Sequence, residues 1–207
     1  MHIVFLRGFN LTTSSPLKPI WANVPKELTA CPRWVCWKIA RGTKVPFDAR
    51  QEHAHASVSK PETWCGFQEA KEAYITRMNE PHGFDGIGIV LVGDGLVAVD
   101  LDHCVMDGQP SLEAQELLQQ IGPTYVEISP SGEGIRAFAF ANPLAKGLKA
   151  NLRGVSVELY SNLRYLTVTG HSISPIAVAH CDGFNSIANE IEELRKKTTS
   201  NGQWNLP

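Results

Sequence analysis

Two apolar runs joined by a short glycine-containing link constrain the fold of this chain most strongly. Residues 87–92 and 96–101 are almost entirely apolar, and Gly93-Asp94-Gly95 separates them. Short apolar runs bounded by glycine are typical of buried strands. A link this short between two such runs favours a hairpin. We therefore expect a β-sheet core in which the two runs form neighbouring antiparallel strands.

Strand-favouring residues recur elsewhere in the chain. They occupy residues 33–39, 125–128 with an extension at 135–140, 155–160 and 164–168. These segments are rich in the aromatic and β-branched residues that pack well in sheets. The strands do not alternate regularly with helices, so the order predicts an α+β domain with a mostly antiparallel or mixed sheet.

Three segments show helical spacing. The first follows Pro61 and places Phe67, Ala70 and Tyr74 on one stripe. Ser111 precedes the second, where its hydroxyl can cap the helix. That helix carries its apolar stripe on Ala114, Leu117, Leu118 and Ile121 and stops at Gly122-Pro123. The third carries Phe184, Ile187, Ala188, Ile191 and Leu194 on one side, and we expect it to end near Lys197.

The chain length fits one domain with short appendages. Its 207 residues, 43% hydrophobic and 19% charged, are enough to bury a sizeable core. Serines and prolines interrupt residues 1–23, so we expect a peripheral segment there, a folded domain over 24–197 and a polar tail over 198–207. No apolar stretch is long enough to span a bilayer and no signal peptide is recognisable, which favours the cytoplasm.

Cysteine content and charge give weaker indications. The five cysteines are odd in number and include no CxxC pair, so a disulfide framework is not expected. A zinc site from Cys31 and Cys36 with His53 or His55 is an alternative to ordinary buried thiols. The formal net charge of −2 does not indicate a nucleic-acid-binding protein. Local basic clusters exist, but composition alone interprets them as solvated faces.

The sharpest chemical feature is the pair Asp100 and Asp102 at the end of a buried strand. Alternate side chains of a strand share a face, and their Cα atoms lie roughly 6.5–7 Å apart. Two metal ions in a phosphoryl-transfer site lie about 4 Å apart, so such a pair can flank them. Two buried carboxylates repel each other unless a cation lies between them. An isolated DxD also arises by chance.

Glu158 is a candidate third carboxylate. In the strand at 155–160, Val155, Val157 and Leu159 share one face, while Ser156, Glu158 and Tyr160 share the other. Taken alone, an exposed strand glutamate explains this residue equally well.

A serine- and glycine-rich turn joins two of the predicted strands. Gly132 and Gly134 allow a tight turn whose N–H groups can face an anion. Ser129 and Ser131 add hydroxyl groups, and Arg136 begins the next strand, where it can clamp a phosphate. A plain loop with a surface arginine is the alternative.

In this order, the motifs resemble the archaeo-eukaryotic primase superfamily, and in particular the primase-polymerase domains of phages, plasmids and integrated mobile elements. The family's first motif is a strand bearing DxD, here Asp100 and Asp102. Its second is a Ser/Gly turn leading to a basic residue, here 131–136, and its third is an acidic strand residue, here Glu158. The family's usual histidine is replaced by Arg136. The resemblance covers about residues 33–171.

The resemblance implies a fold, a reaction and partners. The fold is an N-terminal αβ unit packed on an RRM-like subdomain that carries the carboxylates. The implied reaction is DNA-templated nucleotidyl transfer from nucleoside triphosphates, extending a primer, in a bacterial or phage-infected cell. A helicase domain is expected to follow on a longer chain, with the polar tail as the start of a linker.

The resemblance also implies site residues. Asp100, Asp102 and Glu158 would hold two Mg²⁺ or Mn²⁺ ions. The triphosphate would contact Ser129, Ser131, Gly132, Gly134 and Arg136, with Lys44 and His171 as further candidates for phosphate or template contacts. Arginine can bind phosphate as a fixed cation, but it cannot shuttle protons near neutral pH. Two alternatives stay open, a catalytically inactive nucleic-acid-binding module with the same fold and a metal-dependent nuclease.

Overall fold

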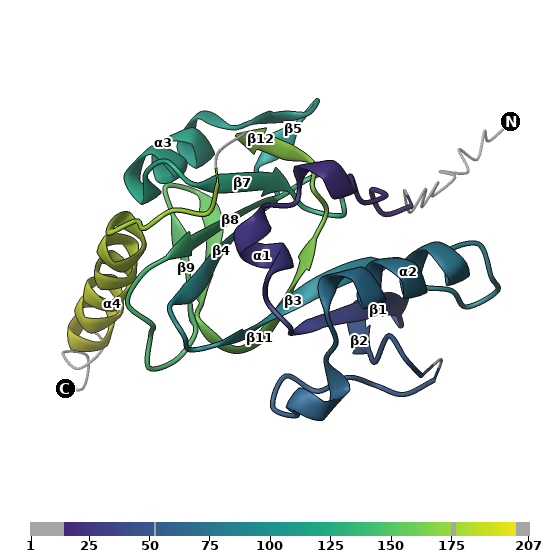
Figure 1. Cartoon of the computed structure of the whole chain (residues 1–207). Coiled ribbons are helices and arrows are strands. Elements are labelled where there is room, and N and C mark those ends of the chain that lie inside the picture. Colours follow the sequence, from purple (N-terminus) through teal and green to yellow (C-terminus); the bar gives the residue numbers. More distant parts are fainter. Residues whose placement is uncertain (1–14, 52, 175–176, 202–207) are drawn as a thin grey trace, which may run out of the picture.

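The chain folds around two antiparallel β-sheets, which Figure 1 shows side by side. The computed structural model describes residues 15–51, 53–174 and 177–201. The smaller sheet has four strands in the order β11-β3-β1-β2. Its strands are β1 (Trp34–Ala40), β2 (Thr43–Phe47), β3 (Gly86–Val92) and β11 (Asn162–Val168).

The larger sheet has six strands in the order β12-β7-β8-β4-β10-β9. They are β4 (Leu96–Asp102), β7 (Tyr125–Ile128), β8 (Ile135–Phe140), β9 (Leu148–Leu152), β10 (Val155–Tyr160) and β12 (Ser172–Ser174). A short ribbon of β5 (Val105–Met106) and β6 (Gln109–Pro110) follows β4. The predicted α+β fold, an αβ unit packed on a larger antiparallel sheet, is confirmed.

Helices pack against both sheets (Figure 1). They are α1 (Lys26–Thr29), α2 (Phe67–Arg77), α3 (Leu112–Ile121) and α4 (Gly183–Asn201), with 3-10 turns at Trp21–Asn23 and Pro61–Thr63. Ser111 caps α3 as predicted, because its hydroxyl accepts the Ala114 N–H at 3.2 Å. None of the helices in the described residues is long and apolar enough to cross a bilayer.

Two apolar cores follow from strand alternation. Leu96 and Ala98 of β4 pack into the core that the larger sheet shares with the smaller one. Val97, Val99 and Leu101 point the other way, into the core under α3 and α4. Successive strand residues face opposite sides, so β4 is apolar on both faces along most of its length. At its C-terminal end, Asp100 and Asp102 take the positions that face the smaller sheet.

The predicted hairpin between residues 87–92 and 96–101 is wrong. Both segments are strands, but β3 pairs with β1 and β11, whereas β4 pairs with β8 and β10 in the other sheet. The glycine link crosses between sheets instead of reversing within one. It is fixed there by the Gly93 N–H, which donates to the Ser161 carbonyl at 2.8 Å, and by the Arg33–Asp94 ion pair at 2.7 Å.

Both ends of the described chain differ from the sequence expectation. Within the segment expected to be peripheral, Leu17 and Ile20 donate backbone hydrogen bonds to Pro130 and Thr169, and the Trp21 ring packs edge-on against Tyr74. Residues 1–14 and 202–207 lie outside the described residues. Helix α4 continues past Lys197 to Asn201, because the polar residues there still sustain helical hydrogen bonding.

The cysteines are free thiols in the described structure, four of them buried and Cys31 half-buried. Within the described residues no group of three or more His, Cys, Asp or Glu side chains could hold a metal ion, so the alternative zinc site is not formed there. The Cys36 thiol donates to the Ala70 carbonyl, and the His55 ring stacks on Phe47 with the ring centres 4.6 Å apart.

Candidate active site

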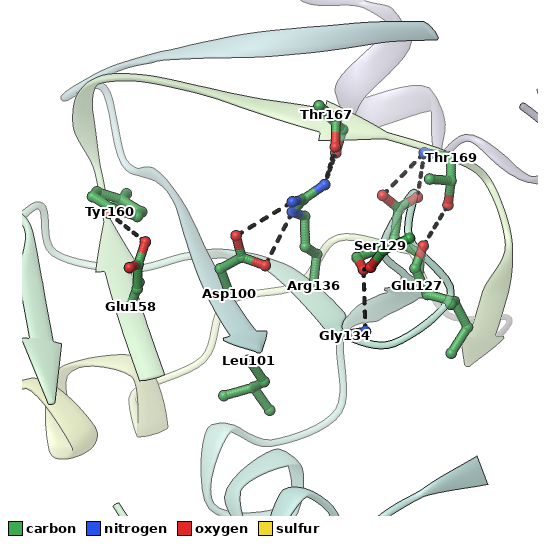
Figure 2. Close-up of polar contacts among 12 residues, drawn as sticks. Asp100, Leu101, Glu127, Ser129, Gly134, Arg136, Glu158, Tyr160, Thr167 and Thr169 are labelled. Carbon is green, nitrogen blue, oxygen red and sulfur yellow. Dashed lines mark hydrogen bonds and ion pairs between the residues drawn. The ribbon is translucent and has the colours of Figure 1, made fainter. Parts of the chain in front are cut away.

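A row of charged side chains crosses the larger sheet on the face turned toward the smaller sheet, next to the apolar residues of that face. The register places Glu127 of β7 opposite Arg136 of β8, Arg136 opposite Asp100 of β4, and Asp100 opposite Glu158 of β10. Lys149 of β9 completes the row beside Glu158. Figure 2 shows Arg136 lying between Asp100 and Thr167, with Leu101 on the opposite face of β4.

The middle of this row, Arg136, Asp100 and Glu158, borders a pocket of about 490 Å³ between the two sheets, whereas Glu127 and Lys149 lie outside the pocket lining. The larger sheet contributes the acidic and basic side chains of β4, β8 and β10, and the smaller sheet contributes the β1–β2 turn and β11. The lining residues are Gly42, Thr43, Lys44, Asp100, Asp102, Arg136, Glu158, Arg164, Tyr165, Leu166 and Thr167. The three carboxylates of the sequence hypothesis therefore meet at one pocket, together with Arg136 and Lys44.

Asp100 and Arg136 form a buried ion pair. Arg136 Nε lies 3.2 Å from Asp100 Oδ1, and Arg136 Nη2 lies 3.3 Å from Asp100 Oδ2. Arg136 Nη1 also donates to the carbonyl and the hydroxyl of Thr167. The Nε–Oδ1 contact has poor hydrogen-bond geometry, so both atoms are buried without a hydrogen-bond partner. Such a pair is strongly coupled, because little water reaches it to screen the charges.

Glu158 is neutralised by its neighbours. Its carboxylate accepts hydrogen bonds from Lys149 and from the Tyr160 hydroxyl, the latter at 2.6 Å, and Arg164 lies 3.7 Å away. Burial alone raises the pKa of Glu158, but the bonds from Lys149 and Tyr160 outweigh it and hold the pKa below its ordinary value. This carboxyl is therefore ionised at neutral pH.

Asp102 differs from the other two carboxylates. It is half-buried, and no side chain of the described residues forms an ion pair with it. Burial raises the pKa of Asp102, and the negative charges of Asp100 and Glu158 raise it further. Lys149 and His103 act in the opposite direction from a distance, so Asp102 is the carboxylate of the pocket that lacks an ion-pair partner among the described residues.

Lys44 brings a second cation to the pocket from the smaller sheet. Burial and the nearby positive charge of Arg136 lower its pKa, while Asp100 and Asp102 act in the opposite direction. Its backbone carbonyl accepts a hydrogen bond from the Tyr165 hydroxyl. Two partly desolvated cations facing one pocket indicate a site for an anion with several charges, such as a polyphosphate.

Comparison with known proteins identifies the family. Residues 19–189 match the model of the family described as "Bifunctional DNA primase/polymerase, N-terminal". The chain belongs to this family. It is also 34% identical over 152 residues to the DNA primase-polymerase of Nitratiruptor phage NrS-1. The alignment covers 70% of this chain but only 20% of the phage protein. The resemblance inferred from the motifs, including its phage-type character, is confirmed.

Within this member of the primase/polymerase family, the pocket gathers residues that lie far apart in the chain. The residues of its pocket come from all three motifs of the sequence hypothesis. Motif residues on β4, β8 and β10 are adjacent in the sheet although up to 58 positions separate them, from Asp100 to Glu158. The pairing of β4 with both β8 and β10 is what gathers them.

The Ser/Gly turn does not line the pocket. Its N–H groups close the turn on itself, since Gly132 donates to the Ser129 carbonyl, Gly134 to the Ser129 hydroxyl and Glu133 to the Ser131 hydroxyl. A Cβ on Gly134 would lie 2.7 Å from the Leu101 carbonyl, so glycine permits close packing on β4. A role of Ser129, Ser131, Gly132 and Gly134 in nucleotide binding stays a prediction.

His171 also lies away from the pocket lining. Its Nε2 is 2.9 Å from the Lys18 carbonyl, and its backbone N–H donates to the Thr169 hydroxyl. The ring is therefore engaged with the N-terminal segment, and contact with phosphate or template stays a prediction for this residue as well.

Several pocket or row residues were not predicted from the sequence. Arg164, Tyr165 and Thr167 line the pocket from β11, and Glu127 begins the row on β7. The signal for Glu127 was its position on the same strand face as Tyr125, as a charged residue inside an apolar strand. No local pattern indicates that β11 would cross to the other sheet and face these residues.

The pocket suits a divalent cation without presenting a preformed cage. In the described part of the chain, no three His, Cys, Asp or Glu side chains are grouped closely enough to hold a metal ion. Asp100 and Glu158 are instead bound to basic or hydroxyl side chains. Even so, Asp100 Oδ1 is buried without a hydrogen-bond partner and Asp102 lacks an ion-pair partner among the described residues. Carboxylate oxygens are the ligands that Mg²⁺ and Mn²⁺ prefer, so the residues fit such an ion.

Proposed function

We propose that this domain catalyses metal-dependent, DNA-templated nucleotidyl transfer in the replication of a phage, plasmid or other mobile element. The observation that carries the proposal is the pocket in which Asp100, Asp102 and Glu158 face the cations Lys44 and Arg136. Carboxylates beside partly buried cations are the combination that a nucleoside triphosphate with its metal ions requires. Family membership and the phage relative support the same reaction class.

Asp100, Asp102 and Glu158 are the proposed ligands of Mg²⁺ or Mn²⁺. When bound, the metal ions supply a lowered pKa for the attacking 3′-hydroxyl and charge compensation for the phosphates. Asp102 is the most available ligand because no side chain in the described part of the chain forms an ion pair with it. At Asp100 and Glu158 a metal ion would have to compete with Arg136 and Lys149, which pair with these carboxylates in the described structure.

Arg136 and Lys44 are the proposed triphosphate contacts. Phosphoryl transfer depends mainly on positioning and charge stabilisation, so a fixed arginine is a workable substitute for the histidine usual in the family. A guanidinium forms two parallel bonds with phosphate, which orients the nucleotide as well as attracting it. The serine and glycine residues of the β7–β8 turn bond to one another and so hold the turn that leads into β8. The expected helicase domain stays a prediction.

Primer extension on a DNA template, with EDTA, Mg²⁺ or Mn²⁺, tests the proposal. The wild type should extend the primer only with metal, and Asp100→Asn should abolish extension while retaining the folded state by circular dichroism. Thr124→Val, a change at a buried hydroxyl away from the pocket, serves as the matched control and should stay active.

The assay also separates the alternatives. Metal-dependent degradation of the primer would support a nuclease. DNA binding without nucleotide binding or extension would favour an inactive binding module. The second alternative has one observation in its favour, since Asp100 and Glu158 are already paired with basic side chains of the chain itself. Extension that persists in Asp100→Asn would refute the proposed site.

A further inference from the structure

Glu127 is a buried carboxylate that the proposed chemistry does not use. It is 0% exposed, although charged groups are rarely buried without a compensating network. Its carboxylate accepts the Thr169 N–H at 3.0 and 3.1 Å (Figure 2). It also accepts the Tyr125 hydroxyl at 2.8 Å and the Gly170 N–H at 2.8 Å. Burial raises the pKa of Glu127, and these bonds together with Arg136 oppose that effect.

These hydrogen bonds join the two sheets. Glu127 belongs to β7 in the larger sheet, whereas Thr169 and Gly170 directly follow β11 of the smaller sheet. One side chain therefore holds two consecutive backbone N–H groups of the segment that leaves the smaller sheet. The Thr169 hydroxyl strengthens the junction by donating to the Ile128 carbonyl at 2.7 Å.

The same junction leads to Arg136. Two residues before Thr169, the carbonyl and hydroxyl of Thr167 accept Arg136 Nη1, and Arg136 contacts Asp100 at its other edge. Thr167 can bond to Arg136 only while the end of β11 keeps its present position relative to β7 and β8. Glu127 holds that position through Thr169 and Gly170, although it does not line the pocket itself.

We propose that Glu127 is a positioning residue of the nucleotidyl-transfer site: by anchoring Thr169 and Gly170 it holds Thr167 where Thr167 orients the Arg136 guanidinium toward the phosphates of the nucleotide. The inference rests on the proposed function. It assigns the residue a role in nucleotide use that differs from general support of the fold.

Two conservative changes, one isosteric and one shorter, distinguish position from charge. Glu127→Asp keeps the charge but withdraws the carboxylate by one methylene from Thr169 and Gly170. Glu127→Gln removes the charge but leaves an oxygen that can occupy the place of Oε2, which accepts from Tyr125, Thr169 and Gly170. Its NH2 group replaces Oε1, so only the second contact with the Thr169 N–H is lost. Positioning predicts that Glu127→Asp is harmful and Glu127→Gln is tolerated, whereas an electrostatic role predicts the reverse.

The experiment is steady-state primer extension with varied nucleotide. In Glu127→Asp, the KM for nucleotide should rise about 3- to 30-fold with a smaller change in kcat, as expected for residues in one hydrogen-bond network. Glu127→Gln should stay within about 3-fold of the wild type. Hydrogen exchange should show faster exchange of the Thr169 and Gly170 amides in Glu127→Asp only.

Two controls separate this role from a loss of stability. Thr124→Val removes a buried hydroxyl at the start of the same strand, where it donates to the Phe138 carbonyl at 2.6 Å. It should lower the melting temperature and leave KM unchanged. In an Arg136→Ala background, Glu127→Asp should have no further effect on KM, because the residue through which Glu127 acts is gone.

Each contrary outcome has a defined meaning. An unchanged KM in Glu127→Asp, a Glu127→Gln variant as impaired as Glu127→Asp, or an undiminished effect in the Arg136→Ala background would each overturn the inference while the proposed function stands. A wild type that binds no nucleotide and extends no primer would instead overturn the proposed function, and this inference with it.

Discussion

Removing the Arg136 side chain is the perturbation for which the structure supplies the clearest expectation. Arg136 is 5% exposed and its partner Asp100 is 8% exposed. Arg136→Ala deletes two contacts to the Asp100 carboxylate and both bonds to Thr167. The carboxylate loses its ion-pair partner while Glu158 and Asp102 remain nearby, so repulsion among the acidic groups increases.

The loss of stability can be estimated from this geometry. Removing one partner of a buried ion pair costs about 3–5 kcal/mol. Asp100 borders an open pocket, so water can reach it once the guanidinium is gone, and we expect a loss near the lower end, about 3 kcal/mol. In a domain of this size that loss lowers Tm by roughly 6–12 °C. Denaturation in EDTA measures it.

Mn²⁺ should return part of that stability. A ligand that binds only the folded state stabilises it by mass action, about 2.7 kcal/mol at 100 times its Kd. Without Arg136 the carboxylates have a higher affinity for a cation, so the Tm increase on adding Mn²⁺ should be larger for Arg136→Ala than for the wild type. Isothermal titration without nucleotide measures the affinity directly.

Although Arg136→Ala should bind Mn²⁺ more tightly, it should use nucleotide less efficiently. A hydrogen bond to a charged group contributes about 1.5–3 kcal/mol, so kcat/KM for nucleotide should fall about 10- to 100-fold in Arg136→Ala. Arg136→Lys should recover only part of it, because an ammonium lacks the planar fork. If Arg136→Ala binds Mn²⁺ no more tightly than the wild type and uses nucleotide equally well, Arg136 is not the counter-ion of this site and the reasoning fails.

Three further changes test other parts of the site. Asp102→Asn should abolish nucleotide addition and the stabilisation by Mn²⁺. The metal-free Tm should stay equal or rise, because the change removes a carboxylate without an ion-pair partner, and a calorimetric scan with and without Mn²⁺ measures both effects. The lowered pKa of Lys44 means that it loses its charge at a lower pH than an ordinary lysine, so nucleotide affinity should fall as pH rises, and Lys44→Arg should flatten that dependence in a fluorescence titration. Gly134→Ala should cost about 1–3 kcal/mol in urea denaturation, because its Cβ would collide with the Leu101 carbonyl, and an unchanged midpoint would mean that the backbone shifts freely there.

Local sequence patterns predicted the longer elements of this domain, although not β2, β9, β12 or α1. Alternation and apolar runs identified the strands at residues 87–92, 96–101 and 155–160, and the hydroxyl of Ser111 marked the start of α3. The same alternation placed Asp100 and Asp102 on one face of their strand. These properties could be predicted because strand periodicity and helix capping depend on residues only a few positions apart.

Tertiary structure alone decided which strands became neighbours and what faced the carboxylates. The 87–92 and 96–101 runs had every local feature of a hairpin, yet each found partners in a different sheet, because pairing depends on the burial that distant strands offer. The same long-range pairing set Arg136 opposite Asp100 and brought Thr167 across from the smaller sheet, while the Ser/Gly turn and His171 were left outside the pocket. The sequence alone supplied the chemical groups of the site and the strand face of each; their register across β7, β8, β4 and β10 came from packing between segments that share no local pattern.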